Sequence, residues 1–177
     1  MVLQRLFQPS AHRLAGQNLY EAATRQARQP AFYADLAAPD TVEGRFELYT
    51  LHVVLLVHRL KGQGDEAAKV SQALFDAYLQ ALDDALREMG VGDLSVAKKM
   101  RKLGEAFYGR ATAYQTELAA PGMPGLAALI ERTVYADAEG APVDRLVDYV
   151  QRSAAALEAM SVDEVVAAKF NWPEIPA

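Results

Sequence analysis

The sequence predicts an all-α fold, a single compact bundle of about seven helices, on the basis of composition, periodicity and length. Alanine occurs 33 times and leucine 21 times, whereas isoleucine occurs only at Ile130 and Ile175. Alanine and leucine favour helices, whereas strands favour β-branched and aromatic residues. Apolar residues recur at helical spacing along most of the chain. A length of 177 residues fits one domain with a sizeable core.

Capping and helix-breaking residues divide the chain into seven or eight helical segments. Pro9 and Ser10 open the first segment, Pro30 closes it, and Asp40 or Thr41 caps the third. The later boundaries follow from glycines and from acidic or serine caps in the same way. The expected helices cover residues 11–29, 31–37, 41–61, 65–89, 93–118, 122–137, 143–157 and 162–169.

Hydrophobic patterns indicate where several of these helices lie. Residues 45–61 are apolar nearly all round in their middle, which is typical of a helix at the centre of a bundle. Residues 65–89 are amphipathic, and residues 93–118 carry one apolar stripe. We expect Asp93 and Ser161 to cap the helices that follow them. The tail at 171–177 holds two prolines and Trp172 and should lie extended.

The domain prediction is an N-terminal helical arm (1–29) packed on one helical domain (30–170), followed by the tail (171–177). The arginine-rich, acid-poor start also fits a mitochondrial presequence, but a helix continuous with the fold explains it better. The most apolar stretch, at 48–57, has ten residues, whereas a membrane span needs about 20. We therefore expect no transmembrane helix.

Composition excludes several kinds of chemistry. The absence of cysteine excludes disulfides, iron–sulfur clusters, cysteine-ligated zinc and thiol nucleophiles. A net charge of −5 argues against general attraction to nucleic acid, although a local basic patch could still act.

No motif supports enzymatic activity, a metal site or a cofactor. We therefore expect the protein to have none of these three. His52 and His58 are six residues apart, so their rings point about 120° apart on one helix and cannot chelate one ion. We interpret them as hydrogen-bonded or surface histidines, with haem ligation as a remote alternative. Asp83 and Asp84 resemble a magnesium-binding pair, but Arg87 occupies the place of the further acid. There is no phosphate-binding loop and no nucleophile elbow.

A localised basic cluster is the most informative surface feature. It comprises Lys98, Lys99, Arg101 and Lys102, and Arg110 follows two turns later. It is either an ordinary solvated face with pairs such as Arg101–Glu105, or a binding surface. As a binding surface it would suit anionic membrane lipids, ribosomal RNA or an acidic protein partner.

Two glycines interrupt the same helix. Gly104 and Gly109 each cost about 1 kcal/mol relative to alanine in a helix interior. Close approach of another backbone usually explains such a glycine, and we expect internal packing here. The alternative is a docking notch for a partner helix beside Tyr108 and Arg110.

Several blocks together resemble the ubiquinol–cytochrome c chaperone family. They are Phe46-Glu-Leu48 with Leu51-His52 and Arg59-Leu60, then Arg87-Glu-Met-Gly-Val-Gly-Asp93, Lys98-Lys-Met-Arg-Lys102 and Phe107-Tyr-Gly-Arg110. The resemblance covers roughly residues 30–150. It implies a bacterial relative of the mitochondrial assembly factors for ubiquinol–cytochrome c reductase, without a catalytic motif.

The resemblance implies newly made cytochrome b as a protein client, shielded before assembly. It also implies a small helper protein and contact with the ribosome. The basic cluster itself suggests an anionic membrane surface as a further partner. The expected location is cytoplasmic, peripheral to the inner face of the inner membrane. A ribosome- or RNA-associated module without a membrane client is the alternative. The expected contact residues are Lys98, Lys99, Arg101, Lys102, Tyr108 and Arg110.

Overall fold

The computed structural model describes residues 10–136 and 138–176, and within these residues all regular secondary structure is helical. The helices are α1 (Ala11–Ala27), α2 (Pro30–Ala34), α3 (Val42–Leu60), α4 (Asp65–Glu88), α5 (Asp93–Ala119), α6 (Leu126–Thr133), α7 (Val143–Glu158) and α8 (Val162–Val166). The all-α prediction is therefore confirmed, and most predicted helices begin or end within a few residues of the observed ones.

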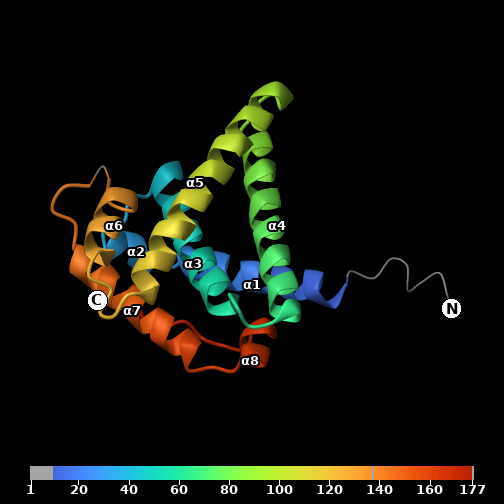
Figure 1. Ribbon diagram of the computed structural model, residues 1–177. Helices are drawn as coiled ribbons and strands as arrows, with labels where there is room; N and C mark the ends of the chain where they lie inside the picture. Colours follow the sequence, from blue (N-terminus) through green and yellow to red (C-terminus); the bar gives the residue numbers. More distant parts are fainter. Residues whose placement is uncertain (1–9, 137, 177) are drawn as a thin grey trace.

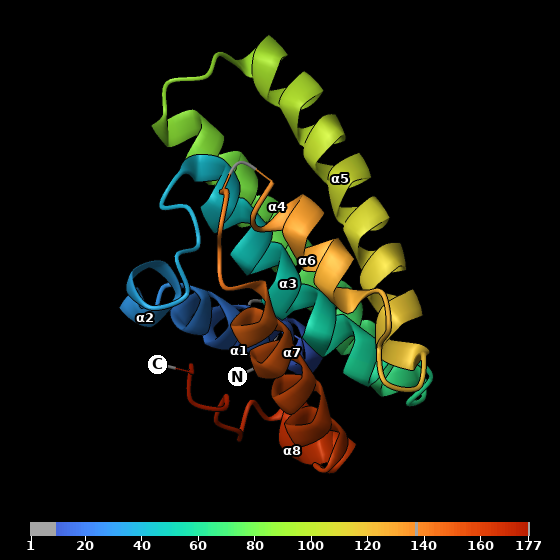
Figure 2. The same ribbon diagram turned by 90° about the vertical axis from the view of Figure 1, so that its left-hand side faces the viewer.

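Helix α3 occupies the centre of the molecule, with α1, α4, α5 and α7 packed around it (Figures 1 and 2). Its residues from Leu51 to Leu56 are all buried, which explains why this helix is apolar on every side. The polar residues that α3 does bury are each bonded to a neighbouring element. They are Glu47, Thr50, His52 and Arg59.

Helix α1 belongs to this same core, because Leu19, Ala23 and Ala27 pack in it. Where α1 crosses α4, a Cβ atom added to Gly16 would lie 2.6 Å from the backbone of Ala73. The crossing therefore depends on a glycine at this position. Residues 1–9 of the predicted N-terminal arm lie outside the described residues.

Helices α4 and α5 form a long hairpin whose connecting end projects away from the rest of the molecule (Figure 1). Leu86 and Val96 are buried between the two helices near this end. Met89 and Leu94 beside the connection are instead exposed, by 54% and 94%. The tip of the hairpin is thus an apolar surface that no other element covers in the described part of the chain.

The capping predictions had mixed outcomes. The Thr41 hydroxyl accepts a hydrogen bond from the Gly44 amide, and Ser161 forms a complete capping box with Glu164. The prediction that Asp93 caps α5 is wrong: Gly92 is the N-cap residue, and Asp93 is the first helical residue. Its carboxylate accepts a hydrogen bond from Arg87 instead.

The helix predicted over 122–137 is shorter than expected. Helix α6 begins only at Leu126, because Pro124 lacks an amide hydrogen and Gly122 and Met123 have positive φ angles of 74° and 49°. A turn here lets the Gly125 amide donate to the Glu117 carboxylate at 2.7 Å. This bond ties the beginning of α6 to the end of α5.

The C-terminal tail runs without helix or strand over residues 171–176, as the sequence predicts, but the helix predicted over 162–169 already ends at Val166. Its Trp172 ring packs edge-on against His52 at 4.9 Å between centroids, and the Trp172 indole donates to the Ala22 carbonyl of α1. No helix among the described residues is both long enough and apolar enough to span a bilayer.

Candidate partner-binding surface

The outward face of α5 carries most of the residues singled out in the sequence. Positions 94, 98, 101, 102, 105 and 108 fall within about 120° of the helix circumference. The buried residues Val96, Phe107, Ala111 and Tyr114 lie on the opposite side, against the rest of the bundle. We call this outward face the α5 outer face. It combines two exposed apolar side chains, Leu94 and Tyr108, with three exposed cations, Lys98, Arg101 and Lys102.

All four members of the basic cluster are exposed. Arg101 lies 3.5 Å from Glu105, an exposed pair that contributes little to stability. Among the residues that the structure describes, the three lysines of the cluster form no ion pair within 4.0 Å. Lys99 lies on the flank of the α5 outer face rather than at its centre. The cluster is therefore a solvated positive surface available to an anionic partner.

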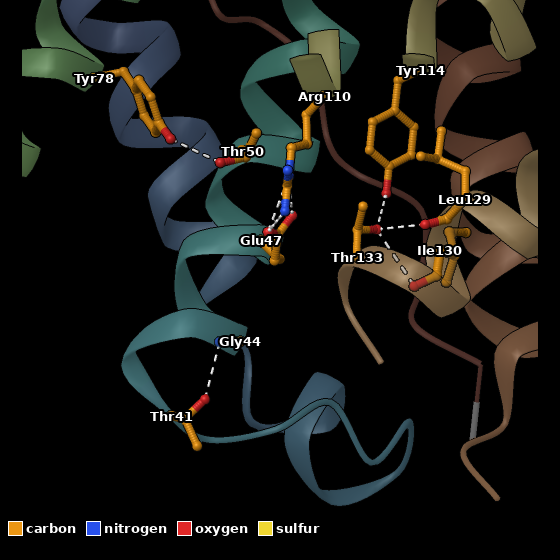
Figure 3. A network of polar contacts seen from close by, with 10 residues as sticks. All are labelled: Thr41, Gly44, Glu47, Thr50, Tyr78, Arg110, Tyr114, Leu129, Ile130 and Thr133. Atoms are coloured by element: carbon orange, nitrogen blue, oxygen red, sulfur yellow. Dashed lines mark hydrogen bonds and ion pairs between the residues drawn. The ribbon is translucent and has the colours of Figure 1, made fainter. Parts of the chain in front are cut away.

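Arg110 differs from the other candidates. Its guanidinium faces inward and forms a bidentate ion pair with Glu47 of α3, with Nη2–Oε1 at 2.6 Å and Nε–Oε2 at 3.1 Å (Figure 3). The Glu47 side chain is only 9% exposed, and that of Arg110 is 32% exposed. This pair raises the pKa of Arg110 further above its usual value. Because its charge is engaged inside the protein, Arg110 is not part of the exposed positive surface.

Tyr108 lies at an aromatic groove between α3, α4 and α5. Its ring is 5.5 Å from that of Phe75, which lies 4.7 Å from the buried Phe107. The groove has a volume of about 320 Å³, and Val57, Leu60 and Lys61 line its other side. Tyr108 itself remains 62% exposed. The α5 outer face therefore continues into an apolar hollow with a cation, Lys61, among its lining residues.

The expectation that Gly104 and Gly109 permit close packing is wrong. A Cβ atom added at either glycine would meet nothing within 4 Å, since both positions face open space. Glycines that do permit close packing lie outside α5, as at Gly16 in α1 and Gly44 in α3. Internal packing thus explains neither glycine of α5, and the docking notch is the alternative that remains.

Replacing these two glycines should strengthen the fold. Gly104→Ala and Gly109→Ala should each raise the free energy of unfolding by about 1 kcal/mol, because alanine has the higher helix propensity and no neighbour is displaced. Urea denaturation followed by circular dichroism measures this change. Gly16→Ala is the matched control and should destabilise, because its Cβ atom would overlap Ala73. Destabilisation by the α5 variants would contradict the open environment.

The apolar tip of the hairpin was missed in the sequence. Leu94 falls outside the buried stripe of α5, and this mismatch is the signal that could have revealed it. A leucine that is 94% exposed next to a basic cluster is typical of a surface that contacts a membrane or a partner protein.

Comparison with known proteins identifies the family. Residues 34–172 match the family described as Ubiquinol-cytochrome C chaperone. The chain belongs to this family. The match contains the basic cluster, Tyr108 and the α4–α5 hairpin, so the resemblance noted in the sequence is confirmed.

Two curated relatives of this family member carry the name ubiquinol-cytochrome c reductase complex assembly factor 1. The protein of Drosophila melanogaster is 25% identical over 164 residues, covering 89% of this chain and 63% of that protein. The protein of Mus musculus is 22% identical over 156 residues, covering 87% of this chain and 52% of that protein. The chain thus spans between about half and two thirds of the length of these relatives.

A solved structure shows the same fold. The crystal structure of the Cbp3 homolog from Brucella abortus is 34% identical and superimposes with a TM-score of 0.85. The alignment covers 99% of this chain and 98% of that chain. Both proteins therefore share the same fold over nearly their whole aligned length.

His52 and Asp83 have structural roles, whereas the buried Nδ1 atom of His58 has no hydrogen-bond partner among the described residues. The His52 Nδ1 atom donates to the Leu48 carbonyl at 2.7 Å, and its Nε2 accepts from the Tyr149 hydroxyl at 2.8 Å. Arg87 donates to Asp83, as expected from its position one turn later. Within residues 10–136 and 138–176, no three histidine or acidic side chains are grouped to hold a metal ion.

Proposed function

We propose that this chain is a non-enzymatic assembly chaperone for ubiquinol–cytochrome c reductase that shields newly made cytochrome b. The family match and the names of the relatives support the complex as the target. The observation that carries the proposal in this chain is the α5 outer face. It places exposed apolar side chains and exposed cations together on a projecting hairpin.

The physical basis lies in the chemistry of the client. A multi-span membrane protein exposes apolar helix faces before its helices pack together. The aromatic groove at Tyr108, Phe75 and Phe107 offers an apolar surface for such a face. The basic cluster would meanwhile rest on the phosphate groups of the membrane, where each cation contributes about 1 kcal/mol. Four such groups give reversible rather than permanent attachment.

The apolar tip favours a lipid or protein partner over RNA. Leu94 and Met89 offer no hydrogen bonds to bases or phosphates, and burying them in a bilayer interface or a protein is favourable. An RNA-binding surface would have no use for these aliphatic side chains and would lose affinity steeply with salt.

Charge reversal of the basic cluster tests the proposal. Changing Lys98, Lys99, Arg101 and Lys102 to glutamate should weaken binding to phosphatidylglycerol vesicles at least about a hundredfold, since about 4 kcal/mol of attraction is removed. Cytochrome b content should fall when this variant replaces the wild type in a deletion strain. Vesicle sedimentation and reduced-minus-oxidised spectra of membranes measure the two effects.

The matched control applies the same change of net charge elsewhere. Arg13, Arg25, Lys69 and Lys169 are exposed cations away from α5, and changing all four to glutamate should leave cytochrome b content near the wild-type value. Gly109→Leu fills the notch beside Tyr108 without changing charge and should reduce capture of nascent cytochrome b. Normal assembly in the cluster variant, at equal protein level, would refute the proposed role of the α5 outer face.

A further inference from the structure

A second concave region lies where the end of α1, helix α2 and the beginning of α3 meet. It encloses about 630 Å³. Its chemistry differs from that of the aromatic groove, because two arginines and two tyrosines contribute to its wall. The lining residues are Arg28, Pro30, Tyr33, Ala34, Asp40, Arg45 and Tyr49.

Arg28 is fixed at one side of this pocket by Tyr49. Its Nε atom donates to the Tyr49 hydroxyl at 2.7 Å, and its Cζ atom lies 5.8 Å from the centre of the same ring. Within the described residues, neither terminal amine of Arg28 has a hydrogen-bond partner. The Arg28 guanidinium is therefore held in one orientation, while its terminal amines remain available to bind a ligand.

Arg45 is held in the same manner at the other side. Its Nε atom donates to Asp40 at 2.6 Å, and its Cζ atom lies 5.9 Å from the centre of the Tyr33 ring. The Tyr33 hydroxyl donates to the Ala27 carbonyl, which fixes that ring. Among residues 10–136 and 138–176, the terminal amines of Arg45 likewise form no hydrogen bond.

We propose that this pocket binds a phosphoryl group between the terminal amines of Arg28 and Arg45. Two guanidinium groups, one directly after α1 and one in α3, suit the several oxygens of a tetrahedral anion. Pro30 and Ala34 supply an apolar wall for the organic part of the ligand, and the volume exceeds that of phosphate alone. The site is separate from the α5 outer face, and this inference does not depend on the proposed function.

Asp40 sets the strength of the site. Its carboxylate is the one anion among the lining residues, and it neutralises part of the charge of Arg45. The pocket therefore carries a net charge of about +1, which suits a phosphate ester that is bound reversibly. Removing the Asp40 charge should strengthen binding, whereas removing either arginine should weaken it.

Titration of the full-length chain with glycerol 3-phosphate tests the site, with binding followed by calorimetry at fixed ionic strength. Arg28→Gln and Arg45→Gln should each weaken binding at least about tenfold, since each removes charge-assisted hydrogen bonds. Asp40→Asn should tighten binding severalfold. Arg25→Gln, in the last turn of α1 just before Arg28 but outside the pocket, is the matched control and should change affinity less than twofold.

Two further arms distinguish the source of the phosphoryl group. Phosphatidic acid vesicles that capture the basic-cluster variant, but no longer capture it once Arg28→Gln or Arg45→Gln is added to that variant, identify a lipid headgroup. Glycerol 3-phosphate binding without vesicle capture identifies a free phosphate ester. The proposal is overturned if the wild type binds neither probe, if both arginine variants bind like the wild type, or if succinate binds as tightly as glycerol 3-phosphate.

Discussion

Replacing Arg110 with methionine is expected to lower the free energy of unfolding by about 2 to 3 kcal/mol. The substitution leaves the Glu47 carboxylate, which is 9% exposed, inside the bundle without its cation. Breaking a buried ion pair from one side is costly because the remaining charge has lost both its partner and its water. The neighbouring Thr50–Tyr78 hydrogen bond, at 2.8 Å, lies in the same region and cannot replace the missing donor (Figure 3).

A double variant separates the ion pair from the packing. Glu47→Met with Arg110→Met should recover most of the loss, because two apolar side chains can replace a buried pair at little cost. Urea denaturation at pH 7 gives the free energies for the complete cycle. Lys102→Met, at an exposed position of the same helix, should change stability by less than about 0.5 kcal/mol. An equal loss in the single and double variants would contradict this account.

Acid should weaken the fold through His52. Burial lowers the pKa of His52 from 6.5 to about 4, since the ring is enclosed by Phe32, Tyr149 and Trp172. A protonated Nε2 could no longer accept from the Tyr149 hydroxyl. The folded protein therefore retains the neutral ring under conditions in which an unfolded chain has already taken up a proton.

The sign of the effect follows from this difference. The contribution of His52 is fully present above about pH 6.5 and is lost as the pH falls towards 4, where the accumulated loss of stability is about 3 kcal/mol. Urea midpoints measured between pH 7.5 and pH 4 should fall more steeply for the wild type than for His52→Gln. Parallel pH profiles of the two proteins would show that His52 is not the group responsible.

Local signals in the sequence located most of the helices. Thr41 and Ser161 cap helices because each hydroxyl reaches an amide in the first turn, a contact that depends on adjacent residues alone. The apolar run in α3 likewise indicated a central helix. Residues 122–125 were misassigned although Gly122 and Pro124 are local turn signals, whereas the bond from the Gly125 amide to Glu117 in another helix could not be predicted locally.

The candidate surface was less predictable than the fold. Helical spacing placed Lys98, Arg101 and Lys102 on one face, and the structure shows them exposed. The same spacing could not show that Arg110 turns towards Glu47, 63 residues earlier. Nor could it show that Gly109 faces open space while Gly16 contacts α4, because both depend on how helices cross. The pocket at Arg28 and Arg45 is a further case, since three segments must fold together to form it.

The packing of Trp172 gives the molecule an intrinsic optical reporter. It is the only tryptophan in the chain. Fluorescence excited at about 295 nm therefore arises from one ring of known surroundings. That ring joins the last residues of the chain to α1 and to His52. Its emission therefore follows detachment of the tail separately from loss of helix, and distinguishes fraying at this end from melting of the whole bundle.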